Sequence, residues 1–306
     1  MWGGGTADSS TAGGAQSRAM RAERELPVTF QRAVSASLAR RYPLVLATPG
    51  DNIGLTIGAL REVERGNSAL IIICVDLTEQ VLCEATAQHA AFIVTYSPVL
   101  SAPISALSTD DVTGRILLKC AQHSLAVYSI HTACDNAYGG INDWLANSVA
   151  AGRIRPIIPH PEHMDAGHGR LLECELSTPL SNLVERLKKL LQVRHLRLAL
   201  GAMVDEQNLS RALEACFVKT FAVQVGVATS SIQDCPADVL IASEMSHSDV
   251  LAANAKGVVV ILTGRSTIER AYLGFLRQEL QDEFADSDWS VKVKCSQVDS
   301  NPLSVV

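Results

Sequence analysis

The sequence predicts an α/β protein in which two similar lobes, each with a mixed, mostly parallel sheet, face a central cleft. Short continuous apolar runs, such as residues 69–75 and 258–262, are typical of strands that are buried on both faces. Each run ends in a polar turn and is followed by apolar residues at helical spacing, which indicates alternating strands and helices. The same order of elements occurs in both halves, so we expect an N-terminal lobe over residues 27–165 and a C-terminal lobe over residues 166–306.

Residues 1–26 are rich in Gly, Ala, Ser and Thr, a composition that predicts a disordered leader. Arg18, Arg21 and Arg24 lie on an Ala-rich stretch, so a mitochondrial transit peptide is an alternative to the cytoplasmic location that we expect. Three acidic residues in the same region count against that alternative.

The predicted N-terminal lobe begins with a helix in which Phe30, Val34 and Leu38 are spaced to lie on one face. A βαβ unit follows, and its crossover should be right-handed. We expect the segment 100–115, which has no clear period, to be a loop or lid. The predicted helices and strands of this lobe are residues 27–41, 69–75, 76–89, 91–94, 125–128 and 141–149.

The predicted C-terminal lobe starts after a Pro- and His-rich stretch over residues 152–169, which we interpret as a solvated linker. The helix over residues 180–191 is amphipathic and basic, and we interpret its charges as a solvated face. The predicted strands are residues 171–176, 195–200, 221–227, 237–243 and 258–262, and one more short strand in the tail. The closing helix is predicted over residues 267–283.

The composition excludes several classes of partner. Hydrophobic residues make up 47% of the 306-residue chain and charged residues 19%, which permits a sizeable core. The net charge of −6 argues against direct nucleic-acid binding. The longest apolar runs are too short to cross a bilayer, so we expect no membrane partner. The eight cysteines form no C-x-x-C pair, which indicates reduced thiols in an intracellular protein.

The stretch from Tyr128 to Trp144 is the predicted functional centre. The strand over residues 125–128 is followed by His131 and Asp135, and ligands in open α/β sheets bind at the carboxyl ends of strands. An imidazole and a carboxylate are good ligands for a divalent cation. The alternatives are a histidine bonded to a core carbonyl and an ordinary turn before Gly139.

Other polar residues occur at similar positions. Asp51 and Asn52 lie in a loop with two glycines, which can bring polar groups to a ligand or form an Asx turn. Tyr96 and Ser97 follow the second strand of the βαβ unit. His247 follows the strand over residues 237–243.

Taken together, these turns resemble the Ngg-one-interacting-factor-three-like family, whose members are also known as GTP cyclohydrolase I type 2 homologues. The resemblance runs from about Phe30 to Leu280, and His195-Leu-Arg-Leu-Ala-Leu-Gly is typical of eukaryotic-type members. It rests on four motifs: Gly50-Asp-Asn-Ile-Gly-Leu; Tyr128-Ser-Ile-His-Thr-Ala-Cys-Asp followed by Gly-Gly-Ile-Asn-Asp-Trp-Leu; Ser243-Glu-Met-Ser-His-Ser-Asp; and Glu269-Arg270.

The resemblance implies a two-lobed subunit that associates with itself into a dimer or a toroidal hexamer, and two divalent metal ions in the cleft. The implied ligand positions are Tyr96, Ser97, Asp135, Arg265 and Glu269. Ser97 and Arg265 stand where relatives have imidazoles, and a guanidinium has no lone pair to donate. We therefore expect a degenerate site with no metal or one ion, held by Asp135 and Glu269.

Arg265 carries a specific prediction. Two carboxylates in one cleft repel each other unless a cation lies between them. We expect the Arg265 guanidinium to replace the lost metal and to pair with Asp135, Glu269 or both. An alternative for Glu269 is a capping box with Ser266 at the start of the last helix.

Two functions fit these expectations. The first is a binding or scaffold protein, or pseudoenzyme, whose partner is another protein, because the family name refers to an interaction in transcription. The alternative is a metal-dependent hydrolase of the GTP cyclohydrolase type 2 kind that acts on a nucleotide-like or phosphorylated substrate. The residues expected to line the cleft are Asp51, Asn52, Tyr96, Ser97, His131, His247 and Arg265.

Overall fold

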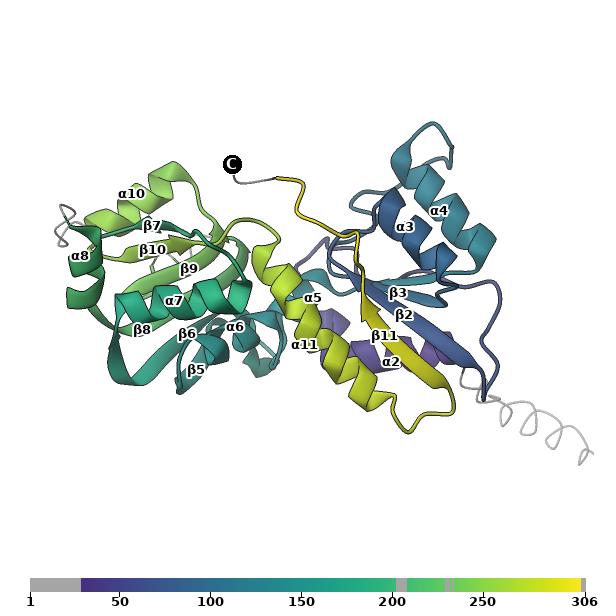
Figure 1. Cartoon of the computed structure of the whole chain (residues 1–306), viewed down its shortest axis with the longest axis horizontal. Helices are drawn as coiled ribbons and strands as arrows, with labels where there is room; N and C mark the ends of the chain where they lie inside the picture. The colour runs from purple at the N-terminus through teal and green to yellow at the C-terminus, as the bar shows by residue number, and fades with distance from the viewer. Residues whose placement is uncertain (1–28, 202–207, 229–231, 233, 304–306) are drawn as a thin grey trace, which may run out of the picture.

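The computed structural model describes residues 29–201, 208–228, 232 and 234–303, so the expected leader lies outside the described residues. The chain forms two mixed sheets with helices packed on them (Figure 1). The prediction of an α/β protein is therefore confirmed.

The first sheet has five strands in the order β1-β4-β3-β2-β11. β2, β3, β4 and β11 are parallel, and β1 runs antiparallel to β4. The strands are β1 (Gly54–Ile57), β2 (Ser68–Cys74), β3 (Phe92–Thr95), β4 (Ala126–Ser129) and β11 (Ser290–Cys295). Their apolar runs are buried because helices cover both faces.

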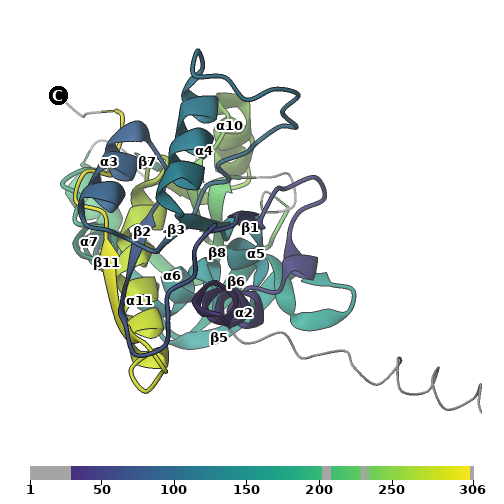
Figure 2. The same cartoon turned by 90° about the vertical axis from the view of Figure 1, so that its right-hand side faces the viewer.

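Each face of the first sheet has its own pair of helices. α3 (Glu79–Ala87) and α4 (Val112–His123) cover one face, and α2 (Phe30–Arg41) and α11 (Thr267–Glu283) cover the other (Figure 2). Successive residues of a strand point to opposite faces. Ile72 consequently packs in the core under α3, whereas Ile71 and Ile73 pack in the core under α2 and α11.

The second sheet has six strands in the order β5-β6-β8-β9-β10-β7. Only the pairs β8–β9 and β9–β10 are parallel. The expectation of mostly parallel strands thus holds for the first sheet and is wrong for the second. The strands are β5 (Gly152–His160), β6 (His163–Pro179), β7 (Arg197–Ala199), β8 (Phe217–Val227), β9 (Val239–Glu244) and β10 (Val259–Leu262).

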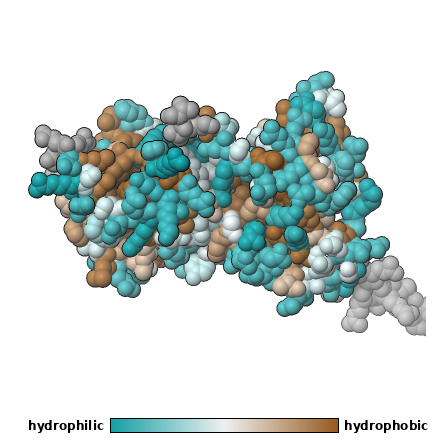
Figure 3. Space-filling view, in the orientation of Figure 1, coloured by the Kyte–Doolittle hydropathy of each residue, from teal (hydrophilic) through white to brown (hydrophobic). Residues whose placement is uncertain are grey.

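The remaining helices surround the second sheet and the junction of the lobes. They are η1 (Leu44–Leu46), α5 (His131–Asn136), α6 (Ile141–Val149), α7 (Leu180–Leu191), α8 (Leu209–Ala215) and α10 (His247–Ala255). On the face drawn in Figure 3, hydrophilic and hydrophobic residues alternate over both lobes, and the surface is indented between them. No helix among the described residues has the length and apolarity needed to cross a bilayer.

Two sequence interpretations are corrected. The supposed linker 152–169 is a hairpin made by β5 and the start of β6. β5 is an edge strand, the position in a sheet where proline is tolerated most readily. The segment 100–115 does not stay irregular to its end, because α4 begins at Val112, where the Asp111 side chain accepts the Gly114 N–H at 2.8 Å.

The sheets divide the chain differently from the expected boundary at residues 165 and 166. β5 precedes that boundary but belongs to the second sheet, and β11 follows it but belongs to the first. α11 spans the junction, with contacts to α6 and α7 at one end of its path and to β2 and β11 at the other (Figure 1). The chain therefore forms most of the first lobe, then the second lobe, and its last strand, β11, completes the first sheet.

Candidate functional site

The candidate site lies where α5 and the first turn of α11 meet between the lobes. The polar side chains come from the loop before β1, the residue after β3, α5 and the first turn of α11. β3 and β4 are parallel, so their carboxyl ends reach the same edge of the sheet. This topology brings together Asp51, Tyr96, His131, Asp135 and Glu269, which are far apart in the sequence.

Asp51 orients His131. Both carboxylate oxygens of Asp51 lie 2.9 Å from Nδ1 of His131. The same carboxylate accepts the Thr132 N–H at 3.2 Å and the Thr132 hydroxyl. His131 has φ +24, a conformation that non-glycine residues rarely adopt and that these bonds help to hold. Because Asp51 engages Nδ1, the Nε2 atom of His131 is the nitrogen left for a ligand.

Asp135 is a part-buried carboxyl group bonded to Tyr96. The Tyr96 hydroxyl donates to Oδ1 of Asp135 at 2.5 Å, and the Tyr96 ring lies edge-on to His131 with centroids 5.6 Å apart. Burial raises the pKa of Asp135 to about 8. The hydrogen bond from Tyr96 lowers this pKa, and the negative charges of Glu269 and Asp51 raise it further. Asp135 therefore holds a proton near neutral pH.

Glu269 is the second carboxyl group of the site. Its side chain is 5% exposed, and Oε2 has no hydrogen-bond partner among the described residues. Burial raises the pKa of Glu269 to about 7. The capping-box interpretation is wrong, because Ser266 has φ +60 and its side chain makes no capping hydrogen bond. Glu269 is thus a buried residue that does not form a capping box with Ser266.

Arg265 does not pair with these carboxylates, which corrects the prediction that its guanidinium replaces the metal. Its side chain is 71% exposed, and its ion pair in the described structure is with Glu244 at 3.6 Å. Gly264 and Ser266, on either side of it, both have positive φ. This turn directs Arg265 toward the end of β9, whereas Glu269 lies one turn into α11 and points inward. Arg265 acts on Glu269 only through its charge, which lowers the pKa of Glu269 against the effect of burial.

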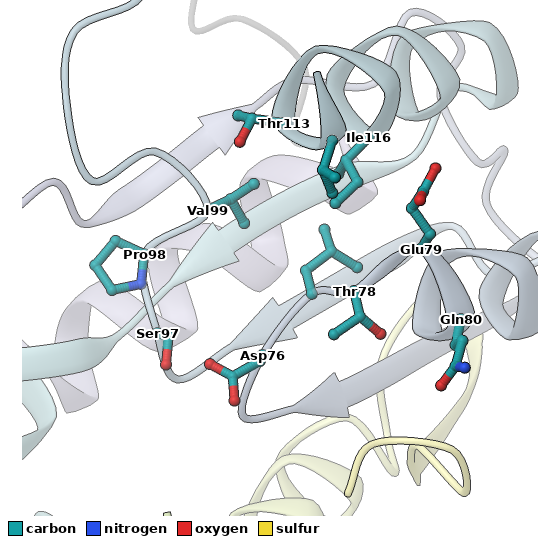
Figure 4. A pocket seen from close by; sticks show the side chains of 11 residues that line it. Asp76, Thr78, Glu79, Gln80, Ser97, Pro98, Val99, Thr113 and Ile116 are labelled. Carbon is teal, nitrogen blue, oxygen red and sulfur yellow. The ribbon is translucent and has the colours of Figure 1, made fainter. Parts of the chain in front are cut away.

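Three other predicted residues lie outside the cluster. Ser97 lines a cavity of about 410 Å³ between α3, α4 and the carboxyl ends of β2 and β3, and Figure 4 shows it beside Asp76 at one end of that cavity. The Asn52 side chain donates to the Leu100 carbonyl at 2.9 Å and so ties two loops together. His247 is exposed and lines a separate cavity beside β7.

The residues present do not fit a centre of two metal ions. Ser97 and Arg265 supply no imidazole; Ser97 lines the cavity beside α3 and α4, and Arg265 is exposed and pairs with Glu244. Over the described ranges, no group of three or more His, Cys, Asp or Glu side chains is placed to hold a metal ion. Oε2 of Glu269 has no hydrogen-bond partner among the described residues, so its lone pairs are free to coordinate a metal ion. Two carboxylates alone, however, make an incomplete coordination shell.

Sequence reasoning missed the group that supports the site. Arg170 is fully buried and donates to both carboxylate oxygens of Asp143, at 2.7 and 3.0 Å. It also donates to four carbonyls, those of Asn136, Ala137, Gly167 and Gly169. This arginine therefore joins β6 to the turn between α5 and α6, directly after Asp135. Its signal in the sequence was weak, because Arg170 stands directly before the predicted strand over residues 171–176.

Comparisons with known proteins agree with the fold. The model of the family described as Duf34/NIF3 (NGG1p interacting factor 3) matches residues 31–302. The Schizosaccharomyces pombe "Protein NIF3 homolog" is 33% identical over 273 residues, which is 87% of this chain and 94% of that protein. A Drosophila melanogaster "NIF3-like protein 1" is 31% identical over 280 residues, which is 90% of this chain and 88% of that protein.

Solved structures show the same architecture at lower identity. A Bacillus cereus protein related to NIF3 has a TM-score of 0.73 and 20% identity, over 90% of this chain and 98% of that one. Reduced HcgD from Methanocaldococcus jannaschii has a TM-score of 0.68 and 22% identity, over 87% of this chain and 97% of that one.

Proposed function

Because the chain belongs to the Duf34/NIF3 family, we propose that it is a binding or scaffold protein, a pseudoenzyme whose metal centre is largely lost. In this proposal a polar ligand binds between the lobes at Asp51, His131, Asp135 and Glu269. The observation that carries it is the pair of carboxyl groups formed by part-buried Asp135 and buried Glu269, in which the charge of Glu269 acts on Asp135. The exposed Arg265 makes its ion pair with Glu244 and not with either of these groups.

The chemistry of the pair favours a neutral, hydrogen-bonding ligand group. With a pKa of about 8, Asp135 is mostly protonated at pH 7, and Glu269, with a pKa of about 7, is protonated in part. A protonated carboxyl group donates one hydrogen bond and accepts others, so the pair recognises a group with both capacities. His131 adds Nε2 as a further donor or acceptor.

Metal analysis tests the proposal. Protein purified without chelators is expected to contain less than one equivalent of zinc, iron or manganese by elemental analysis, because binding would need protons to leave both carboxyl groups. Titration calorimetry with Mn²⁺ at pH 7 is expected to give weak binding that disappears in Asp135→Asn. Two equivalents of tightly bound metal would contradict the proposal.

The second candidate function is hydrolysis, and the Asp51–His131 pair favours it. A carboxylate that fixes one ring nitrogen and leaves the other free is the usual arrangement of a general base. The substrate would be nucleotide-like or phosphorylated, as in GTP cyclohydrolase type 2 enzymes. A hydrolysis screen with added Mn²⁺ separates the two functions.

Asp135→Ala is compared with the parent in that screen, and Asp288→Ala, which removes an exposed ion pair with Arg65, is the matched control. Activity that Asp135→Ala loses and Asp288→Ala keeps supports the enzyme. No activity in any of the three supports the binding protein.

The assembly and the location are proposals too. The Saccharomyces cerevisiae relative, 28% identical over 284 residues, is named "NGG1-interacting factor 3", and that name supports a protein partner. Self-association into a dimer or a toroidal hexamer follows from the family resemblance, and light scattering that gives a monomer mass would contradict it. We place the protein in the cytoplasm, with mitochondria as the alternative.

A further inference from the structure

The C-terminal segment 296–303 lies across the carboxyl end of β2 instead of leaving the fold after β11 (Figure 1). Its first residues are fixed to α3, because the Ser296 hydroxyl and the Gln297 N–H both donate to the Glu84 carboxylate. Further on, the Asn301 side chain donates to the Arg265 carbonyl at 3.4 Å. The segment thus runs from α3 to the turn before α11, beside the candidate site.

Asp299 fills a carboxylate site in the middle of this segment. Its side chain is 4% exposed, and its Oδ2 accepts the Val75 N–H at 2.7 Å. Its Oδ1 lies 2.6 Å from Nη1 of Arg270, and Nη2 of Arg270 donates to the Ser300 carbonyl at 3.0 Å. One carboxylate oxygen therefore accepts a backbone N–H, and the other forms a close ion pair with a guanidinium.

The same place holds donors that Asp299 does not use. Nε and Nη1 of Arg270 and Oγ of Ser266 are buried and have no hydrogen-bond partner in the described part of the chain. Buried donors normally find acceptors, so the guanidinium keeps hydrogen-bonding capacity that Asp299 leaves unused. Asp76 lies 3.4 Å from Nη2 of Arg270, and its negative charge opposes a dianion more than a monoanion.

We propose that Arg270 and the Val75 N–H form a receptor for the carboxylate group of a ligand, and that Asp299 occupies this receptor as a displaceable internal ligand. Arg270 directly follows Glu269 in α11, so the receptor lies next to the residue that supplies one carboxyl group of the candidate site. Because Asp299 is tethered, it competes at a high effective concentration. At low concentration a ligand must therefore make further contacts, for example at the carboxyl pair, to displace the segment, whereas a simple carboxylate must be concentrated. The receptor does not depend on the proposed function.

Chemical rescue tests this receptor. Asp299→Ala removes the internal carboxylate from the full chain, and sodium acetate, in buffer with chelator, supplies a free one. Acetate is expected to raise the melting temperature of Asp299→Ala above that in sodium chloride of equal ionic strength. The dependence of the melting temperature on acetate concentration gives the affinity for acetate. Acetate should bind the variant at least about tenfold more tightly than the wild type, whose receptor is filled by Asp299.

The controls locate the site and the ligand class. Asp288→Ala should respond to acetate as the wild type does, and the double variant Asp299→Ala/Arg270→Gln should lose the acetate effect. Equal acetate binding in that double variant, or none in Asp299→Ala, overturns the proposal. Tighter binding of inorganic phosphate than of acetate overturns the assignment to carboxylates.

A second measurement covers the case in which Asp299→Ala does not fold. In the wild type, concentrated acetate should displace Asp299 and speed hydrogen exchange of the amides at residues 297–300, relative to chloride. Exchange that is the same in both salts contradicts a displaceable segment. Neither experiment uses a metal or a substrate, so its failure leaves the proposed function untouched.

Discussion

At the scale of single residues, the direction of a side chain decides what the site can do. Asp51, His131, Asp135 and Glu269 could be selected from the sequence because they follow apolar runs or fall in motifs. The direction of Arg265 could not be predicted, because it depends on a turn in which Gly264 and Ser266 both have positive φ. A charged residue at a sequence position that holds a metal ligand in relatives can pair with the site's carboxylates only when the backbone directs its side chain toward them.

The raised pKa of Asp135 makes stability depend on pH. Below pH 4 the group is protonated in both the folded and the unfolded chain, and between pH 4 and about 8 only the unfolded chain ionises it. Asp135 therefore makes the wild type progressively less stable as the pH rises to about 8. Asp135→Asn keeps an acceptor for Tyr96 and removes this loss.

Asp135→Asn should accordingly have a higher free energy of unfolding in urea than the wild type at pH 8. The difference between the two proteins should be larger at pH 8 than at pH 5 by at least about 1.4 kcal/mol. Asp288→Asn, at an exposed ion pair, is the control and should follow the wild type. Parallel pH profiles for Asp135→Asn and the wild type would contradict the raised pKa.

At the scale of elements, regular periodicity and the parallel pairing of β2 with β3 were predictable, whereas the more distant strand pairings were not. The helices predicted over residues 180–191 and 267–283 agree with α7 and α11, because their apolar residues repeat at helical spacing. The hairpin of β5 and β6 was hidden by prolines and histidines, which are compatible with an edge strand. The pairing of β11 with β2 links residues more than two hundred positions apart, and no local pattern encodes that contact.

The junction between β6 and the α5–α6 turn should depend on Arg170. Arg170→Met leaves the buried Asp143 carboxylate without its cation, so it is expected to lower the free energy of unfolding by about 3–5 kcal/mol. Arg170→Met/Asp143→Leu should recover part of that loss, because no charge is left buried. Arg153→Met, at an exposed position on β5, is the matched control. A loss below about 1 kcal/mol in urea unfolding would argue against this role.

At the scale of the whole molecule, the returning segment joins the lobes. α11 contacts α6 and α7 near the second sheet and β2 and β11 in the first. Trp289 packs on Phe30 in the first lobe with ring centroids 5.6 Å apart, and Trp144 packs on Tyr272 of α11 at 5.5 Å. Each tryptophan therefore reports on a different part of the connection.

We expect the two lobes to unfold in one transition, because neither keeps its core intact without α11. In a Trp2→Phe background, which leaves one tryptophan in each variant, fluorescence of Trp144→Phe and Trp289→Phe should give the same urea midpoint after correction for the effect of each substitution on stability, measured by circular dichroism. Two separate midpoints within one variant would show that the lobes unfold independently.

The position of β11 also has a consequence for synthesis on the ribosome. β11 covers the edge of β2, yet residues 290–295 are translated after the whole second lobe. Until then the nascent first lobe presents the bare edge of β2, an arrangement that invites pairing with other chains. Newly made protein should therefore need protection by chaperones during translation, and the first lobe closes only after the second has emerged.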